Sequence, residues 1–247
     1  MSRNLVRLTA PGKTAVFLLP FAGASASSYW SWAELLPAGF EVSAVQLPGR
    51  QDRWEEAPYE QFDQVVDDLT TEVAAVVDGR DFVLVGHSLG AAIGFEVAHE
   101  LRARSLPAPA LLVISSATAP QVDHEVSAED RLSDDELIAK TKEGGRLPSV
   151  ILDNPELLEL VLPSLRADLR LVGTYKYVPR EPLGCPMSIF GGRQDPLVPV
   201  SGLEPWRELT SNRASLRTYD GDHFYLWEHE QEVAAALLAD MRQEVAG

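Results

Sequence analysis

The sequence predicts an α/β fold: a mostly parallel central sheet flanked by helices on both faces. Short apolar runs closed by glycine, proline or polar residues alternate with amphipathic stretches of helical length. Continuous apolar runs are typical of strands buried on both faces, and their alternation with helices favours a parallel sheet. One long stretch has no strand candidate and breaks the alternation. We therefore expect a core formed by residues 1–119 and 178–247, with a helical insertion at 120–177, called the insertion below.

The strands and helices of the core follow from the spacing of apolar residues. We expect strands at 14–20, 40–47, 81–86, 110–115, 187–190 and 216–219. Apolar residues at three- and four-residue steps predict a helix over 62–77, and two more helices are expected at 89–104 and 230–244. In the insertion we expect helices over 134–143, 154–162 and 163–175, with Asn154 as the N-cap before Pro155.

Composition excludes several classes of function. The 247 residues include 21 Lys and Arg against 37 Asp and Glu, for a net charge of −16, so nucleic acid and membrane partners are not expected. The lone Cys185 excludes an internal disulfide and is expected to be buried, and no cluster suits a metal. No apolar run approaches the roughly 18 residues of a membrane span, and we see no signal peptide. We expect a cytoplasmic protein.

The first chemical motif is Gly86-His-Ser-Leu-Gly90, placed between an expected strand and an expected helix. A serine between strand and helix sits on a tight turn that needs glycine two residues before and two after it. Its hydroxyl then projects at the sheet edge, where amides at the helix start also point. Ser88 is therefore the candidate nucleophile, and we interpret His87 as a packing residue. The alternative is a turn without chemistry.

A serine nucleophile needs a base, and the base needs an orienting carboxylate. Among five histidines, His223 is the best candidate because it lies in a loop between the last expected strand and the last helix. Asp195 follows the fifth expected strand, while Asp220 and Asp222 compete by proximity. A separate loop orients an imidazole better than a near neighbour does, so we choose Asp195. The order Ser, Asp, His is that of the α/β-hydrolase fold.

An oxyanion hole needs two backbone donors. One should come from the loop Leu19-Pro-Phe-Ala-Gly-Ala24, whose small residues allow close approach of the backbone. We expect the amides of Ala22 and Leu89 to form the pair.

Six segments together resemble the stand-alone type II thioesterases that accompany polyketide and nonribosomal peptide synthases. They are 19–23, 47–53, 86–90, 155–168, 190–195 and 221–226. One departure is visible, because the family usually has histidine and then Ala-Gly-Gly in the first segment, and this chain has Phe21-Ala-Gly-Ala24. The changed side chains of Phe21 and Ala24 bear on access to the oxyanion hole.

The resemblance implies an α/β-hydrolase that removes acyl groups from the phosphopantetheine thiol of acyl or peptidyl carrier proteins. It implies no cofactor of the enzyme's own, and we expect a monomer. Carrier proteins are usually acidic, so docking on a chain of charge −16 should depend on local basic or apolar patches. Candidate docking residues are Arg50, Arg53, Arg102 and Arg104, and the alternative for each is a solvated arginine.

The insertion is expected to act as a lid over the site. Leu158 and Leu162, with Phe21, are candidates to line an acyl channel, and Leu157, Val161 and Leu165 share the helical spacing. The same leucines are equally explained as the core of the insertion. Gly144-Gly145 and the acidic stretch 121–135 are candidate hinges.

Three rival functions stay open. A terminal releasing thioesterase of a synthase has the same fold, but the short distance from Met1 to the first expected strand argues against this alternative. A general carboxylesterase would share the triad. A non-catalytic interaction module would be expected to have lost a catalytic residue, whereas Ser88, Asp195 and His223 are all present.

Overall fold

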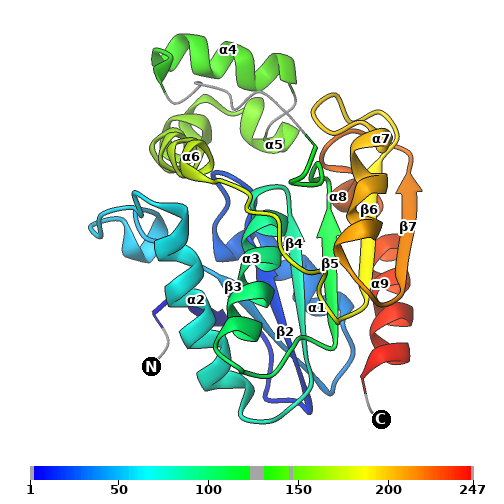
Figure 1. Ribbon diagram of the computed structural model, residues 1–247. Helices are drawn as coiled ribbons and strands as arrows, with labels where there is room; N and C mark the ends of the chain where they lie inside the picture. The colour runs from blue at the N-terminus through cyan, green and yellow to red at the C-terminus, as the bar shows by residue number, and fades with distance from the viewer. Residues whose placement is uncertain (1–2, 123–130, 145–146, 246–247) are drawn as a thin grey trace.

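One sheet forms the centre of the molecule (Figure 1). The computed structural model describes residues 3–122, 131–144 and 147–245. Within these ranges seven strands pair in the order β1-β3-β2-β4-β5-β6-β7. The strands are β1 (Leu5–Arg7), β2 (Thr14–Leu19), β3 (Phe40–Val45), β4 (Phe82–His87), β5 (Leu111–Ser115), β6 (Met187–Gly192) and β7 (Ala214–Tyr219). Only β1 runs antiparallel to its neighbour among them, so the mostly parallel α/β sheet is confirmed.

Helices cover both faces of this sheet (Figure 1). They are α1 (Trp30–Leu35), α2 (Phe62–Val77), α3 (Leu89–Ala103), α4 (Asp134–Gly144), α5 (Ser149–Leu152), α6 (Pro155–Thr174), α7 (Val200–Leu203), α8 (Tyr225–Glu228) and α9 (Glu230–Glu244). Alternate side chains of β2 divide between the two faces: Phe17 and Leu19 pack with α2 and α3, whereas Leu18 packs with α1 and α9. Because successive strand side chains point to opposite faces, one apolar run supplies both cores.

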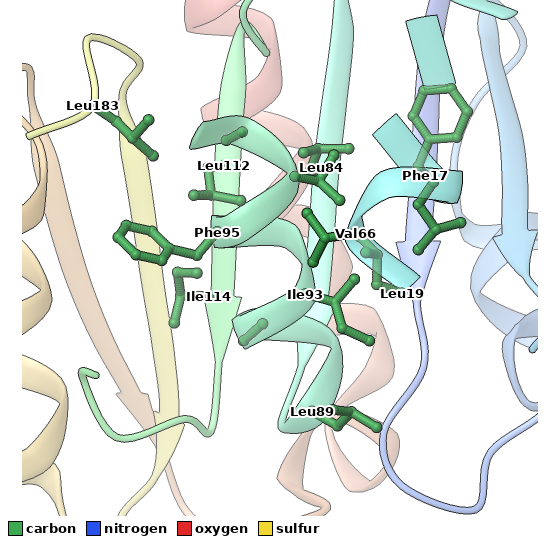
Figure 2. Packing of buried hydrophobic residues seen from close by; sticks show 14 of the residues in the cluster. Phe17, Leu19, Val66, Leu84, Leu89, Ile93, Phe95, Leu112, Ile114 and Leu183 are labelled. Carbon is green, nitrogen blue, oxygen red and sulfur yellow. The ribbon is translucent and has the colours of Figure 1, made fainter. Parts of the chain in front are cut away.

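The core under α3 fixes the helix that follows Ser88 (Figure 2). Ile93 and Phe95 lie in one apolar cluster with Leu84 of β4 and Leu112 of β5, and each is at most 1 % exposed. Full burial of such a side chain contributes roughly 1.5–3 kcal/mol to stability. The start of α3 is therefore a rigid platform at the carboxyl end of the sheet.

The insertion contributes α4, α5 and α6, which lie above the carboxyl ends of the strands (Figure 1). Asn154 caps α6 as expected, because its side chain accepts from the amides of Glu156 and Leu157. The two helices expected on either side of Pro163 are wrong: α6 runs through the proline. Proline removes one helical hydrogen bond, but buried leucines before and after it, such as Leu162 and Leu165, hold both halves in line.

The structure also contains short strands and helices that the sequence did not predict. The edge strand β1 has three residues and α1, α5, α7 and α8 have four to six, too few for a periodic pattern. The candidate hinge at Gly145 and residues 123–130 of the acidic stretch lie outside the described residues. The boundaries drawn for core and insertion stay predictions. In the described ranges, no helix combines the length and apolarity needed to cross a bilayer.

Candidate active site

Ser88 lies on the sharp turn between β4 and α3. Its backbone has φ 54° and ψ −116°, an unfavourable conformation for a residue with a side chain, and its amide donates to the Ser115 carbonyl at 2.8 Å. A Cβ on Gly90 would lie 2.3 Å from the carbonyl oxygen of Leu19, so only glycine allows α3 to meet the end of β2. The turn therefore presents the Ser88 hydroxyl at the sheet edge beside the first amides of α3.

His223 and Asp195 form a direct pair. Nδ1 of His223 lies 2.7 Å from Oδ2 of Asp195, and the residues are 3 % and 7 % exposed. An ionised carboxylate only accepts hydrogen bonds, so Nδ1 carries the donated proton and Nε2 faces away as the acceptor. The other carboxylate oxygen accepts from the amides of Leu197 at 2.8 Å and Val198 at 3.0 Å. The carboxylate is fixed in place and so fixes the imidazole.

The loops that carry these two residues touch each other. A Cβ on Gly192 would lie 2.2 Å from the carbonyl oxygen of Asp222, and the amide of Gln194 donates to the Gly221 carbonyl at 3.0 Å. Side chains could not be accommodated at Gly192, so this glycine permits the close approach of two loops about thirty residues apart.

The competing aspartates have other partners. Asp220 pairs with Arg193 at 2.5 Å, and the Asp222 side chain accepts from the amide of Phe224 at 2.7 Å. Among the three aspartates considered, the structure thus brings Asp195 to the His223 ring.

The electrostatics of Asp195 favour its ionised form. Burial by itself raises the pKa of this carboxyl, but the hydrogen bond and the electrostatic interaction with the His223 ring, together with the Leu197 amide, outweigh burial and hold the pKa below its usual value. An ionised Asp195 stabilises the cationic ring that forms when His223 takes a proton.

His87 precedes Ser88 in the chain and is buried in the protein. Its Nδ1 is 2.9 Å from the Ser115 hydroxyl, which in turn is 2.7 Å from the hydroxyl of Tyr225. The His87 ring lies 5.0 Å from the His223 ring. Complete burial, and then the neighbouring His223, lower the pKa of His87 well below its usual value. His87 is a neutral packing residue, in agreement with the sequence interpretation.

Ser88 and His223 border the same cavity, which has a volume of about 240 Å³. Its wall is mainly apolar: α6 contributes Leu165, Leu169 and Val172, and further wall residues are Phe21, Phe62, Ala92, Tyr175 and Trp206. None of the described residues lining it carries a carboxylate, ammonium or guanidinium group. Nor do the described ranges contain a cluster of three His, Cys, Asp or Glu side chains suited to a metal. The cavity suits an apolar chain joined to a group that reacts with Ser88.

The two expected oxyanion donors also border this cavity. Leu89 is the first residue of α3, and amides in the first turn of a helix have no intrahelical partner. Ala22 lies in a turn closed by the amide of Ala24 and the carbonyl of Phe21 at 3.0 Å, called the 21–24 turn below. The roles of Ser88, Ala22 and Leu89 stay predictions that this placement supports.

Leu158 and Leu162, expected to line an acyl channel, are not among the residues that border the cavity. They are 4 % and 7 % exposed and belong to an apolar cluster that joins Leu137 and Leu147 of the insertion to Phe21, Ala24 and Phe224 of the core. The apolar stripe runs along α6, but the residues of this helix that border the cavity, Leu165, Leu169 and Val172, all come from its second half. Helical spacing gives the face of a helix and not the position along its axis that meets a ligand. The alternative explanation, a core role, fits the burial of both leucines, and their lining role stays a prediction.

Phe21, also expected at the substrate channel, does border the cavity. Its ring packs at 5.0 Å from Phe224 and 5.1 Å from Trp227. The side chain that departs from the family pattern thus joins the 21–24 turn to the loop and helix that follow His223.

The expected docking role of Arg50 is also wrong. Arg50 is 6 % exposed and forms an ion pair with Asp168 at 2.7 Å, so it cannot meet another protein. Arg53 keeps 10 % of its side chain exposed and binds Glu56 and the Gln46 carbonyl. Loop arginines in a sequence suggest a charged surface, but Asp168, distant in the chain, draws Arg50 inward, and the nearby Glu56 and the Gln46 carbonyl hold Arg53.

Sequence reasoning missed Asp168 and part of the cavity wall. Asp168 stands out afterwards as a carboxylate within the apolar stripe of α6, and it is 2 % exposed. A charged residue in such a stripe signals a buried partner, because an unpaired buried charge is costly. The wall residues Phe62, Tyr175 and Trp206 carry no local signal, since their positions depend on how distant elements pack.

Comparisons with known proteins agree with this geometry. A family model described as a thioesterase domain matches residues 14–241. The gramicidin S biosynthesis protein GrsT of Aneurinibacillus migulanus is 34 % identical over 239 residues, which cover 97 % of this chain and 93 % of GrsT. BorB, a type II thioesterase from the borrelidin biosynthetic cluster, has 32 % identity and a TM-score of 0.88, with 95 % of this chain and 96 % of BorB covered. RedJ, a thioesterase of the prodiginine pathway in Streptomyces coelicolor, has 32 % identity and a TM-score of 0.84, with 95 % and 91 % covered. The chain belongs to the thioesterase domain family of serine hydrolases acting on thioesters, and within it resembles type II thioesterases of polyketide and nonribosomal peptide pathways.

Proposed function

We propose that this enzyme is an editing, or type II, thioesterase that hydrolyses acyl groups from the phosphopantetheine thiol of acyl or peptidyl carrier domains. The observation that carries the proposal is the shared cavity: Ser88 and His223 border one apolar pocket, and Asp195 holds the far side of the His223 ring. Such a wall suits the hydrocarbon part of an acyl chain, whose burial is favourable. The pathways named for GrsT, BorB and RedJ point to the same class of substrate.

In the first half of the reaction, Ser88 attacks the thioester carbonyl carbon while Nε2 of His223 takes the hydroxyl proton. The negative oxygen of the tetrahedral intermediate accepts hydrogen bonds from the amides of Ala22 and Leu89. Collapse breaks the carbon–sulfur bond, and the thiol leaves with the proton from His223. The acyl group stays on Ser88 as an ester.

In the second half, water gives a proton to His223 and attacks the ester carbonyl. The same two amides stabilise the second tetrahedral intermediate. Collapse returns the proton to Ser88 and releases the acid. Asp195 compensates the charge of the imidazolium in both halves. These steps use no cofactor of the enzyme's own.

Docking of the carrier should not depend on the four arginines named from the sequence. Besides Arg50 and Arg53, Arg102 donates to the Glu181 carbonyl, and Arg104 pairs with Glu100 and Asp67. With a net charge of −16, the enzyme repels an acidic carrier. Salt screens this repulsion, so KM for an acyl-carrier falls as ionic strength rises, whereas KM for a small uncharged thioester stays constant. A KM for the acyl-carrier that rises with salt would instead indicate that arginines bind the carrier.

The decisive experiment offers the enzyme carrier domains loaded with acyl chains of different length and follows thiol release by mass. Ser88→Ala lowers turnover by about 10³-fold or more with folding intact. The same acyl groups as simple oxygen esters react more slowly, because the thiolate is the better leaving group and the carrier adds binding energy. Equal rates on free esters would instead indicate a general carboxylesterase. Cyclised or transferred products in place of free acid would indicate a releasing thioesterase, and an inactive wild type would refute the proposal.

Two further properties belong to this proposal. We expect a monomer, because the proposed triad of Ser88, Asp195 and His223 needs no residue from a second chain. We expect a cytoplasmic enzyme, because its substrates are carried on synthases. Sedimentation equilibrium and cell fractionation test the two statements.

A further inference from the structure

A buried ion pair joins two segments 118 residues apart. Arg50, in the loop after β3, binds Asp168 of α6 through two parallel hydrogen bonds, Nη2 to Oδ1 at 2.7 Å and Nη1 to Oδ2 at 2.8 Å. Their side chains are 5 % and 3 % exposed. A bidentate pair of this kind fixes orientation as well as distance.

Both members of the pair also hold the 21–24 turn. Oδ2 of Asp168 accepts from the amide of Gly23 at 2.7 Å, and Nη1 of Arg50 donates to the carbonyl of Ala24 at 2.7 Å. The pair therefore binds the central peptide of the turn and its exit. The Ala22 amide, the proposed oxyanion donor, lies one peptide away.

The 21–24 turn packs closely against α6. Gly23 has φ +83°, and a Cβ there would lie 3.2 Å from Val161 Cγ1 and 3.3 Å from Leu165 Cβ. The ion pair and the packing thus press the turn against the same helix. An oxyanion donor acts only when it lies within about 2.7–3.1 Å of the developing charge. A shift of the turn by ~1 Å removes most of its effect.

We propose that Arg50 and Asp168 are positioning residues for the reaction: they set the 21–24 turn so that the Ala22 amide meets the oxyanion. The inference rests on the proposed function. A buried ion pair is a poor way to gain stability, because apolar side chains of similar size often serve as well or better. The hydrogen bonds to the Gly23 amide and the Ala24 carbonyl are what apolar side chains cannot replace.

The test separates stability from positioning by removing both charges at once. In the variant Arg50→Met/Asp168→Leu, apolar side chains fill the site, so Tm falls only by the cost of leaving the Gly23 amide and the Ala24 carbonyl without partners, and kcat is measured per folded enzyme. The turn loses both anchors, so kcat falls by at least 10-fold, toward the 10²–10³-fold of a missing oxyanion donor. KM changes little because the apolar cavity is intact. A folded double variant with wild-type kcat would overturn the proposal.

The chain offers a matched control pair elsewhere. Arg217 binds both carboxylate oxygens of Asp240, whose side chain is 1 % exposed, and neither residue borders the cavity. Arg217→Met/Asp240→Leu therefore keeps wild-type kcat in the folded enzyme. The Arg217 side chain is 38 % exposed, so this control tests the loss of a bidentate ion pair with a buried carboxylate. A similar fall in kcat in it would show that loss of such a pair lowers activity in general, and would also overturn the proposal.

If the double variant does not fold, the single variant Arg50→Lys tests the positioning role instead. Lysine keeps the charge opposite Asp168 but cannot span both carboxylate oxygens and the Ala24 carbonyl. We expect kcat per folded enzyme to fall about 10-fold, and the inhibition constant of an alkyl boronic acid, whose tetrahedral adduct on Ser88 mimics the oxyanion, to rise by a similar factor. A merely structural role moves Tm and leaves both constants unchanged, which refutes the inference. Failure of the proposed function is distinct, because the wild type itself would then not hydrolyse the thioester.

Discussion

Replacing Gly90 by alanine places a methyl group at the contact between the two segments that carry the proposed oxyanion donors. The new Cβ would lie 2.3 Å from the Leu19 carbonyl oxygen and 2.9 Å from that of Pro20, whereas ordinary contact begins at 3.4 Å. Because both obstacles are backbone, α3 and the end of β2 must separate by about 1 Å. Leu89 lies on one side of this contact, and Ala22 follows on the other.

Two consequences follow for the Gly90→Ala variant. Overpacking lowers the free energy of unfolding by about 1–3 kcal/mol. Separation of the donors by ~1 Å lowers kcat by about 10²-fold in the folded enzyme. Urea denaturation measures the first effect, and hydrolysis of a small acyl thioester, normalised to folded protein, measures the second.

The control lies in the same helix. A Cβ on Gly94 would meet only side-chain carbons, at 3.4 Å from Leu112 and 3.7 Å from Leu19. Gly94→Ala should therefore keep kcat and stabilise the protein by up to about 1 kcal/mol, since alanine favours a helix interior more than glycine. If Gly90→Ala is as active as Gly94→Ala, the backbone contact does not set the donor geometry and the reasoning is refuted.

Two further predictions concern the cavity and pH. Leu169→Trp narrows the cavity and moves the preference among acyl substrates to shorter chains. Leu158→Trp, whose side chain does not border the cavity, lowers Tm without changing this chain-length profile. Identical chain-length profiles for Leu169→Trp and the wild type would contradict the assigned cavity wall. Because the folded-state pKa of His87 is depressed, the unfolded chain binds a proton below about pH 6.5 that the folded chain does not, so the free energy of unfolding decreases as pH falls, by ~1.4 kcal/mol per pH unit from this group. His87→Gln removes that contribution. Denaturation curves measured from pH 7.5 to 5 give the free energy of unfolding against pH, and the same pH dependence in the wild type and in His87→Gln would count against this prediction.

Much of the fold was predictable because its signals are local. Each buried parallel strand is a continuous apolar run, as in 82–85, and each long core helix shows a periodic stripe. The continuity of α6 was not predictable from Pro163, because the cost of a missing hydrogen bond is offset by leucines packed against other segments. The edge strand β1 depends on pairing with β3 and has no pattern of its own.

The same division applies to the site. The tight turn at Ser88 and the placement of Asp195 and His223 on loops after strands follow from local sequence and the topology of parallel sheets. The partner of Arg50 does not, because any of 37 carboxylates could have served and only packing selects Asp168. Likewise, spacing grouped Leu158 with Leu165, but only the docking of α6 shows that Leu165 meets the cavity.

The ion pair also limits how the insertion can move. If α6 swung away as a lid, Asp168 would leave the Gly23 amide and Arg50, and a charged pair would be separated in a buried site, which is costly. Helix α4 is less constrained, since few of its residues besides Leu137 and Thr141 are buried. We therefore expect substrate entry to involve α4 and leave α6 in place. Hydrogen exchange should show slow amides around Asp168 and faster ones in α4. Fast exchange around Asp168 in the free enzyme, slowed when a boronic acid binds Ser88, would show instead that α6 opens.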